Sequence, residues 1–174
     1  MMNKSSAPLF VTKPITVIIV IVNYFSSELT KKLVEQINAF NVNENIKTSI
    51  VCIDNSINKA QERALNEIKT DSACSLDVII NSKNLGFGKA VNTGLNHRHF
   101  DFACTINPDV TLLDNTLEIL LTQAVTHEDQ GLWGGLTVNN KLAPDYRHAW
   151  QEPSLTNTLG WAIWLKHLIN KPQW

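Results

Sequence analysis

Short apolar runs rich in β-branched residues alternate along the chain with segments whose apolar residues recur three or four positions apart. The first pattern predicts buried strands and the second predicts amphipathic helices. Strands are predicted over residues 16–23, 48–53, 76–80, 100–106 and 131–138, the last turning at Asn139-Asn140. Helices are predicted after a Ser26 or Ser27 cap, around 60–68, over 86–95 and after an Asp114 N-cap.

The predicted strands are apolar on both faces and are separated by helices. This pattern is typical of an α/β domain, a Rossmann-like, mostly parallel sheet with helices on both faces. The domain is expected to span residues 15–140, after an extended N-terminal arm over 1–14. No Gly-x-Gly-x-x-Gly follows the first strand and no Gly-Lys-Ser/Thr loop occurs, which argues against NAD, FAD and P-loop binding.

Residues 141–174 differ in texture, because four tryptophans fall within a short span. Ser154 is predicted to cap a helix in which apolar residues occupy more than one narrow stripe. A helix of this kind needs a covering surface. We therefore expect self-association or a protein partner through residues 155–174.

Composition narrows the class of protein. A chain of 174 residues with 44% hydrophobic residues fits one globular domain. The net charge of −1 and the absence of Lys/Arg runs argue against nucleic acid as a partner. Three cysteines without framework spacing predict free thiols in a reducing compartment, and the N-terminus lacks the apolar region of a signal peptide. The expected location is cytoplasmic.

Polar residues follow the predicted strands at the points where they end. The segments are Asn23-Tyr24-Phe25-Ser26, Asp54-Asn55-Ser56, residues 84–92 and Asn107-Pro108-Asp109. Because the carboxyl ends of parallel strands meet at one edge of a sheet, we expect these segments to form one ligand site. Pro108 ends the fourth strand and fixes the position of Asp109.

The residue types in these segments fit a nucleotide diphosphate. Tyr24 offers a ring for stacking on a base, and an ionised Asp54 accepts the imide N–H of a pyrimidine. Asn107 offers hydrogen bonds to ribose, and Asp109 offers a ligand to Mg²⁺ or Mn²⁺ bridging the diphosphate. Gly86 and Gly88 allow backbone to approach a ligand at the start of a helix, which favours a phosphate.

Each residue also has a plain structural interpretation. Tyr24 packs at the sheet edge, Asp54 caps the following helix, the two glycines shape a turn, and Asn107-Pro108-Asp109 is an ordinary turn. Four polar loops at the same sheet edge are harder to explain in this way than any one of them. Together they favour a binding site.

These segments resemble glycosyltransferase family 2, of the GT-A fold. The carrying stretches are Val20-Ile21-Val22-Asn23-Tyr24, Val51-Cys52-Ile53-Asp54-Asn55-Ser56, Asn84-Leu85-Gly86-Phe87-Gly88-Lys89-Ala90-Val91-Asn92 and Asn107-Pro108-Asp109. Asn-Leu-Gly-Phe-Gly together with Asn-Pro-Asp looks most like the rhamnosyltransferase-type branch.

The resemblance implies an inverting, metal-assisted transfer from a UDP or dTDP sugar to a saccharide or lipid-linked acceptor, as in bacterial polysaccharide synthesis. A peripheral contact with the inner face of the membrane is also expected. The resemblance assigns Tyr24, Asp54 and Asn55 to the base, with Asn23 beside them. Asn107 and Asp109 fall at the ribose and metal position. The nucleotide-sugar region comprises Asn84, Gly86, Phe87, Lys89 and Asn92.

The chain departs from the family pattern on the acceptor side. No acidic residue after Asp109 stands in the Glu-Asp context that provides the family's general base, so no catalytic residue is assigned. Residues 141–174 are interpreted as the start of a missing acceptor half, in a chain truncated after its donor half. The alternative is a nucleotide-binding or assembly module without a base.

Overall fold

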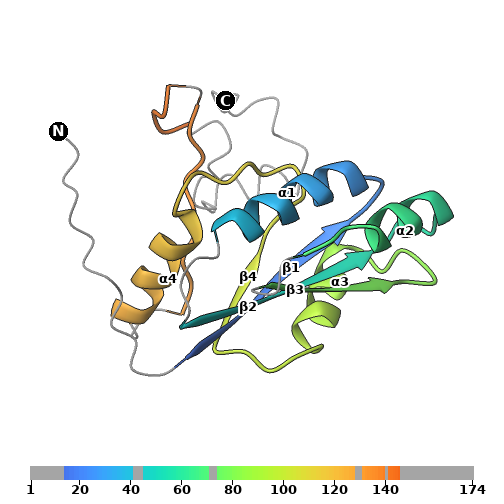
Figure 1. Cartoon of the computed structure of the whole chain (residues 1–174), viewed down its shortest axis with the longest axis horizontal. Coiled ribbons are helices and arrows are strands. Elements are labelled where there is room, and N and C mark those ends of the chain that lie inside the picture. Colours follow the sequence, from blue (N-terminus) through green and yellow to red (C-terminus); the bar gives the residue numbers. More distant parts are fainter. Residues whose placement is uncertain (1–13, 41–44, 71–73, 128–130, 140, 146–174) are drawn as a thin grey trace, which may run out of the picture. The chain divides into compact units, whose positions relative to one another are not determined.

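The computed structural model describes residues 14–40, 45–70, 74–127, 131–139 and 141–145. Contacts divide the chain into two units, Met1–Leu132 and Trp133–Trp174. All helices and strands of the described residues lie in the first unit. In chain order they are β1 Ile15–Asn23, α1 Ser27–Phe40, β2 Ile46–Asp54, α2 Lys59–Asn66, β3 Cys74–Ile80, α3 Phe87–Leu95, β4 Phe102–Thr105 and α4 Thr116–Thr126 (Figure 1).

The four strands form one parallel sheet in the order β3-β2-β1-β4. The chain moves from β1 outward through β2 to β3, and then crosses back to place β4 on the other side of β1. The direction of winding therefore reverses between β1 and β4. Open α/β sheets bind ligands beyond the carboxyl ends of their strands at such a reversal.

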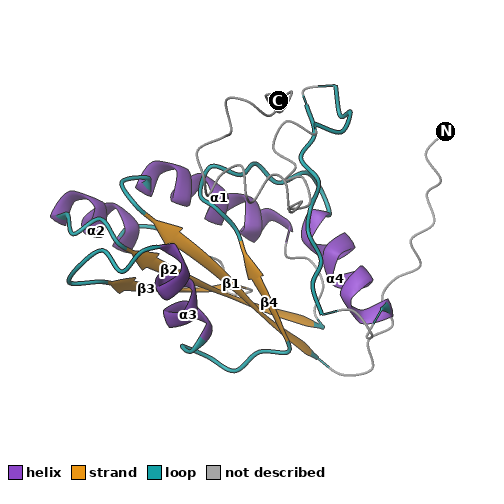
Figure 2. Ribbon diagram, turned by 180° about the vertical axis from the view of Figure 1, so that it is seen from behind, coloured by secondary structure: helices purple, strands orange, loops and turns teal. Residues whose placement is uncertain are grey.

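Helices α1 and α3 lie on opposite faces of the sheet (Figure 2), and an apolar cluster packs on each face. On one face, alternate β1 residues such as Ile19 and Ile21 pack with Leu33, Val34 and Ile37 of α1. On the other face, the intervening β1 residues pack with α3. That second cluster contains Ile18, Val20, Val22, Val51, Ile53 and Ala90. Because β1 and β2 are buried on both faces along Val17–Val22 and Ile50–Ile53, these runs are continuously apolar rather than alternating.

Helix α3 approaches β1 closely at Gly94. A Cβ placed on Gly94 would lie 2.6 Å from Val20 Cγ1 and 3.0 Å from Val20 Cγ2. Val20 is fully buried, so its short branched side chain has little room to move. A side chain at this position is therefore incompatible with the observed packing.

We expect Gly94→Ala to lower the free energy of unfolding by about 1–3 kcal/mol, the usual cost of overpacking a core. The measurement is urea denaturation followed by circular dichroism. Gly88→Ala in the same helix is the matched control, because a Cβ there meets nothing within 4 Å. Equal stability of Gly94→Ala and Gly88→Ala would contradict the predicted contact.

A second link ties the start of β1 to the segment before β4. Asp101 Oδ2 accepts hydrogen bonds from Thr16 Oγ1 at 2.7 Å and from the Thr16 N–H at 2.8 Å. These bonds, that from the Thr16 side chain most of all, lower the pKa of Asp101 below its ordinary value of 3.8. A lowered pKa stabilises the fold above the ordinary value, and this contribution is lost as the pH falls through the lowered pKa.

Asp101→Asn keeps an acceptor oxygen but does not titrate. The wild-type chain is expected to be more stable than this variant at neutral pH, and the difference should shrink as the pH falls below about 4. Urea denaturation at a series of pH values measures it, with the exposed Asp114→Asn as control. A difference that is constant with pH would show that the Asp101 charge does not contribute.

The predicted α/β class with a parallel sheet is confirmed, but two predicted elements are wrong. Residues 131–137 form no strand. Among the described residues from 131 onward, the pairing found is an isolated bridge between Val138 and Pro144. Three glycines in this segment lower its strand propensity, and Leu132 is 89% exposed. Asp114 is not the N-cap of α4, because Asn115 occupies that place in a left-handed conformation that asparagine tolerates.

Several predictions fall outside the described residues. These are the N-terminal arm before Pro14, the helix capped by Ser154 and the surface over 155–174. None of the helices that the structure describes combines the length and hydropathy needed to cross a bilayer.

Candidate functional site

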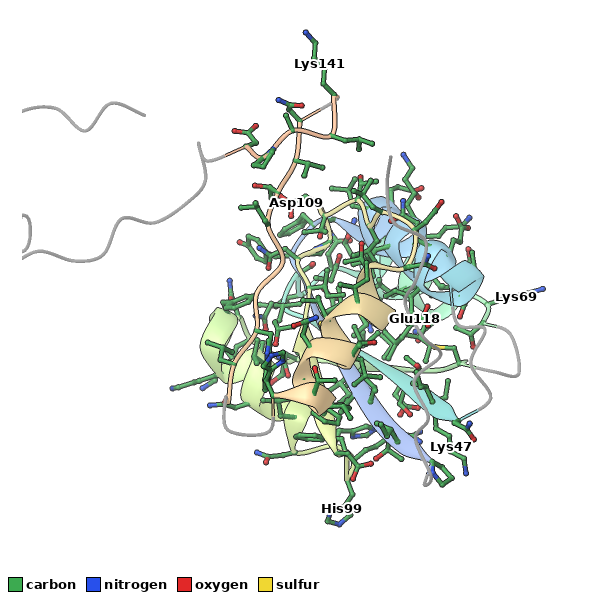
Figure 3. All side chains as sticks on the ribbon, turned by 90° about the vertical axis from the view of Figure 1, so that its left-hand side faces the viewer. Lys47, Lys69, His99, Asp109, Glu118 and Lys141 are labelled. Atoms are coloured by element: carbon green, nitrogen blue, oxygen red, sulfur yellow. The ribbon has the colours of Figure 1, made fainter. Side chains whose placement is uncertain are left out.

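The carboxyl ends of the strands gather the predicted site residues at one edge of the sheet. The register places Asn23, Asp54 and Ile80 side by side across β1, β2 and β3. On the other side of β1, the Ile106 N–H donates a hydrogen bond to Val20 O, and the chain continues from Ile106 to Asp109. Figure 3 shows Asp109 at the end of the first unit opposite to Lys47, at the start of β2, and to His99, three residues before β4.

A cavity of about 300 Å³ opens where the winding reverses between β1 and β4. This volume is at the lower end of the range for small-molecule sites. Tyr24 is one of its lining residues and is 57% exposed, and its ring is edge-on to that of Phe25 with the ring centroids 4.9 Å apart. The lining residues are Val22, Tyr24, Ser26, Leu29, Asn107, Pro108 and Asp109. The structure thus brings together three predicted residues from two loops: Tyr24, Asn107 and Asp109.

Asn23 stands between the lining residues Val22 and Tyr24 in the sequence and is fully buried. Its Nδ2 donates to Asp54 Oδ1 at 2.9 Å, and also to Ser56 Oγ and to Gln61 Oε1 of α2. Its Oδ1 accepts from the Ser26 N–H at 3.2 Å and from Thr30 Oγ1 at 3.1 Å. Both ends of the amide are therefore occupied by protein groups, and Asn23 joins β1, α1 and β2.

Asp54 is also fully buried, and its two oxygens differ. Oδ1 accepts from Asn23 Nδ2 and from the Ser56 N–H, each at 2.9 Å. Oδ2 is buried without a hydrogen-bond partner among the described residues. Burial, with a smaller contribution from the Asp54 charge, raises the pKa of Cys52 to about 12. A buried carboxylate oxygen without a donor is costly unless a ligand supplies one.

The cap of α2 is Asn58 and not Asp54. Asn58 Oδ1 accepts from the Ala60 N–H at 2.9 Å and from the Gln61 N–H at 3.2 Å. The plain interpretation of Asp54 as the cap of the following helix is therefore wrong.

Asn55 connects the second loop to the third. Its Oδ1 accepts from Asn81 Nδ2 at 2.8 Å and from the Leu85 N–H at 3.4 Å, while its Nδ2 donates to Gly86 O at 3.4 Å. Asn84 Oδ1 accepts from the Gly86 N–H at 2.8 Å. Gly86 has a φ of +76°, a conformation that side chains disfavour. Asn55 and Asn84 thus hold the loop that leads into α3.

The remaining predicted residues lie on α3 and are exposed. Phe87 is its first residue, and Lys89 follows within the first turn. Asn92 lies further along the same helix. None of the three lines the cavity between β1 and β4.

The edge can hold a metal only together with a ligand. Asp109 is the one carboxylate among the residues that line the cavity, and the described residues contain no group of three or more His, Cys, Asp or Glu placed to hold an ion. Mg²⁺ is commonly held by one or two carboxylates together with substrate phosphates, and Mn²⁺ also prefers oxygen ligands. The exposed carboxylate of Asp109, with the Asn107 amide beside it in the lining, fits this arrangement.

The sequence analysis did not predict Gln61 or Leu29 as site residues, and it assigned no role to Ser26 and Ser56, although both stand in segments expected to form the site. Ser56 and Gln61 accept hydrogen bonds from the first loop, and Ser26 and Leu29 line the cavity. Ser56 stands inside a segment already singled out, so its hydroxyl was the available signal. Gln61 gives no such signal, because an uncharged glutamine on a polar helix is ordinary.

Comparison with known proteins identifies relatives of this chain. The family model described as Glycosyl transferase family 2 matches residues 16–172. A search of curated proteins gives no match.

Several solved structures are similar to this chain, including two from Pyrobaculum calidifontis and S. aureus. The first is the mannosyltransferase PcManGT from Pyrobaculum calidifontis in complex with GDP-Man and Mn²⁺, at 16% identity and a TM-score of 0.52, covering 62% of this chain and 32% of that one. The second is S. aureus TarS 1-349, at 16% identity and a TM-score of 0.51, covering 65% and 33%. At this identity they show a shared fold, and the chain spans about a third of the length of each.

Proposed function

This chain belongs to glycosyl transferase family 2, and from that premise we propose that it binds a nucleotide-diphosphate sugar at the carboxyl edge of its sheet for transfer of the sugar to an acceptor hydroxyl. The observation that carries the proposal is the cavity between β1 and β4, which is lined by Tyr24 from the loop after β1 and by Asn107 and Asp109 from the loop after β4. The mannosyltransferase of similar fold was solved with GDP-Man and Mn²⁺, which supports a donor of this class.

In the proposed complex the base stacks on the exposed ring of Tyr24. Asp54 Oδ2 is the acceptor assigned to a base N–H, because it is buried and lacks a donor among the described residues. A base that reaches this atom has to displace the group covering it, since Asp54 is fully buried. Asn107 is assigned to the ribose hydroxyls.

Asp109 is the proposed metal ligand. A divalent ion held by this carboxylate and the diphosphate oxygens would neutralise charge on the leaving group. Phe87, Lys89 and Asn92 lie on α3, beyond the loop held by Asn55, and are assigned to the sugar-nucleotide side of the donor.

The proposed reaction is an inverting displacement. The acceptor oxygen attacks the anomeric carbon, the bond from that carbon to the diphosphate oxygen breaks, and a nucleoside diphosphate leaves. The acceptor proton passes to a base that these residues do not identify. The likeness of Asn84–Gly88 and Asn107–Asp109 to rhamnosyltransferases makes dTDP-rhamnose the first donor to test, with a saccharide or lipid-linked acceptor.

A second candidate function is a nucleotide-binding or assembly module without turnover. It is favoured by the lining of the cavity, because no carboxylate of the described residues other than Asp109 belongs to it. A general base must lie within hydrogen-bond reach of the attacking hydroxyl.

Calorimetric titration with UDP, dTDP and GDP, with and without Mn²⁺, tests both candidates. Metal-dependent binding of one of them is the expected result, and no binding of any would reject both. Release of dTDP from dTDP-rhamnose in the presence of an acceptor then separates an enzyme from a module.

A further inference from the structure

The turn that bears Tyr24 has an unfavourable backbone conformation. Phe25 has a φ of +53°, although it is not glycine, and the residue is 56% exposed. Ile57 in the neighbouring loop also has a φ of +53°, which is rarer still for a β-branched residue. Such conformations persist only where surrounding contacts hold them.

Ser56 provides one of these contacts. Its Oγ accepts a hydrogen bond from the Phe25 N–H at 2.8 Å and another from Asn23 Nδ2 at 3.1 Å. Ser56 is only 5% exposed, and its own N–H donates to Asp54 Oδ1. The hydroxyl is thereby fixed at the point where the Phe25 N–H has to lie.

Gln61 provides the second contact, from α2. Its Oε1 accepts from the Ser27 N–H at 3.0 Å and from Asn23 Nδ2 at 3.4 Å. Ser27 is the first residue of α1, where backbone N–H groups have no partner within the helix. The turn at Tyr24-Phe25 is therefore held before Phe25 by Asn23, at Phe25 by Ser56 and after it by Gln61.

We propose that Ser56 and Gln61 are positioning residues that hold the Tyr24-Phe25 turn in the conformation that presents Tyr24 to the nucleotide base. The inference rests on the proposed function, because it makes the affinity for the sugar donor depend on Ser56, which follows β2, and on Gln61 of α2. Neither residue lines the cavity, so both act through the loop.

Gln61 allows a clean test, because both hydrogen bonds that its side chain makes with described residues use Oε1 as the acceptor. Gln61→Met removes the acceptor at similar length, and Gln61→Glu keeps it. A carboxylate at this position also suits the N-terminus of α1. Ser56→Ala tests the other contact, and Gln123→Met on the exposed side of α4 is the matched control.

Amide hydrogen exchange and UDP titration with Mn²⁺ are the two measurements. Ser56→Ala should speed exchange of the Phe25 amide, and Gln61→Met that of the Ser27 amide, each about tenfold. Both should weaken UDP binding about 3- to 10-fold, the range that loss of one net hydrogen bond implies. Gln61→Glu should restore both measurements, and Gln123→Met should match the wild type.

The outcomes separate the inference from the function on which it rests. Unchanged exchange of both amides, or unchanged UDP affinity in both variants of a chain that binds UDP, overturns the positioning role. Failure of the wild-type chain to bind any nucleotide diphosphate overturns the proposed function. In that case faster exchange in Ser56→Ala and Gln61→Met, with recovery in Gln61→Glu, still supports the hold on the turn.

Discussion

Replacing Asp109 by alanine is expected to raise the dissociation constant for UDP, measured with Mn²⁺, by at least about 10- to 100-fold, with little change in its absence. Loss of a group that merely supports a metal ligand already costs this much in metal affinity. Asp109 is the one carboxylate lining the cavity, so the described residues around it offer no substitute of the same charge. Calorimetric titration with and without the ion measures the change.

Asp114→Ala is the matched control, because it removes an exposed carboxylate five residues further along that lies outside the cavity lining. It removes the same charge from the loop after β4, so a general electrostatic effect would appear in both variants. Equal loss of affinity in both, or Mn²⁺-dependent binding that persists in Asp109→Ala, would exclude Asp109 as the metal ligand.

The sheet could be predicted where burial is complete. The central runs Val17–Val22 of β1 and Ile50–Ile53 of β2 are apolar at every position because both faces are covered there, and such runs are typical of buried parallel strands. The apolar residues of 131–138 also predicted a strand, but residues 131–137 pair with no strand of the sheet. Gly131, Gly134 and Gly135 weaken that segment, and apolar content alone does not reveal which neighbour a strand would pair with.

The cavity could be predicted in part for the same topological reason. Tyr24, Asn107 and Asp109 follow strands whose carboxyl ends share an edge, so their meeting required only a parallel sheet. The contacts of Asn23 and Asn55 could not be predicted, because they depend on which loop lies opposite each amide. In the structure both amides bond to protein groups, which favours a positioning role for both.

The pairing of Asn23 with Asp54 is the most demanding contact at this edge. Both residues are fully buried, and the Asn23 amide places two hydrogens toward acceptors of the second loop and α2. Asp54 Oδ1 lies only 2.9 Å from Asn23 Nδ2. The contact therefore requires Asn23 to present a hydrogen-bond donor to Asp54 Oδ1.

Asn23→Asp is expected to destabilise the fold at pH 7 by about 3–5 kcal/mol, the usual cost of an uncompensated buried charge. The substitution keeps the shape of the side chain, but it replaces the donor facing Asp54 Oδ1 by a carboxylate oxygen. A proton shared between the two carboxyls would restore a donor, so the folded variant should bind protons more readily than the unfolded one. Its stability relative to the wild type should then rise as the pH falls from 7 toward about 5.

Urea denaturation across this pH range measures the difference in stability, and Asn92→Asp on the exposed side of α3 should stay within about 0.5 kcal/mol of the wild type. A cost for Asn23→Asp as small as that of Asn92→Asp would mean that Asn23 does not hold the buried carboxylate.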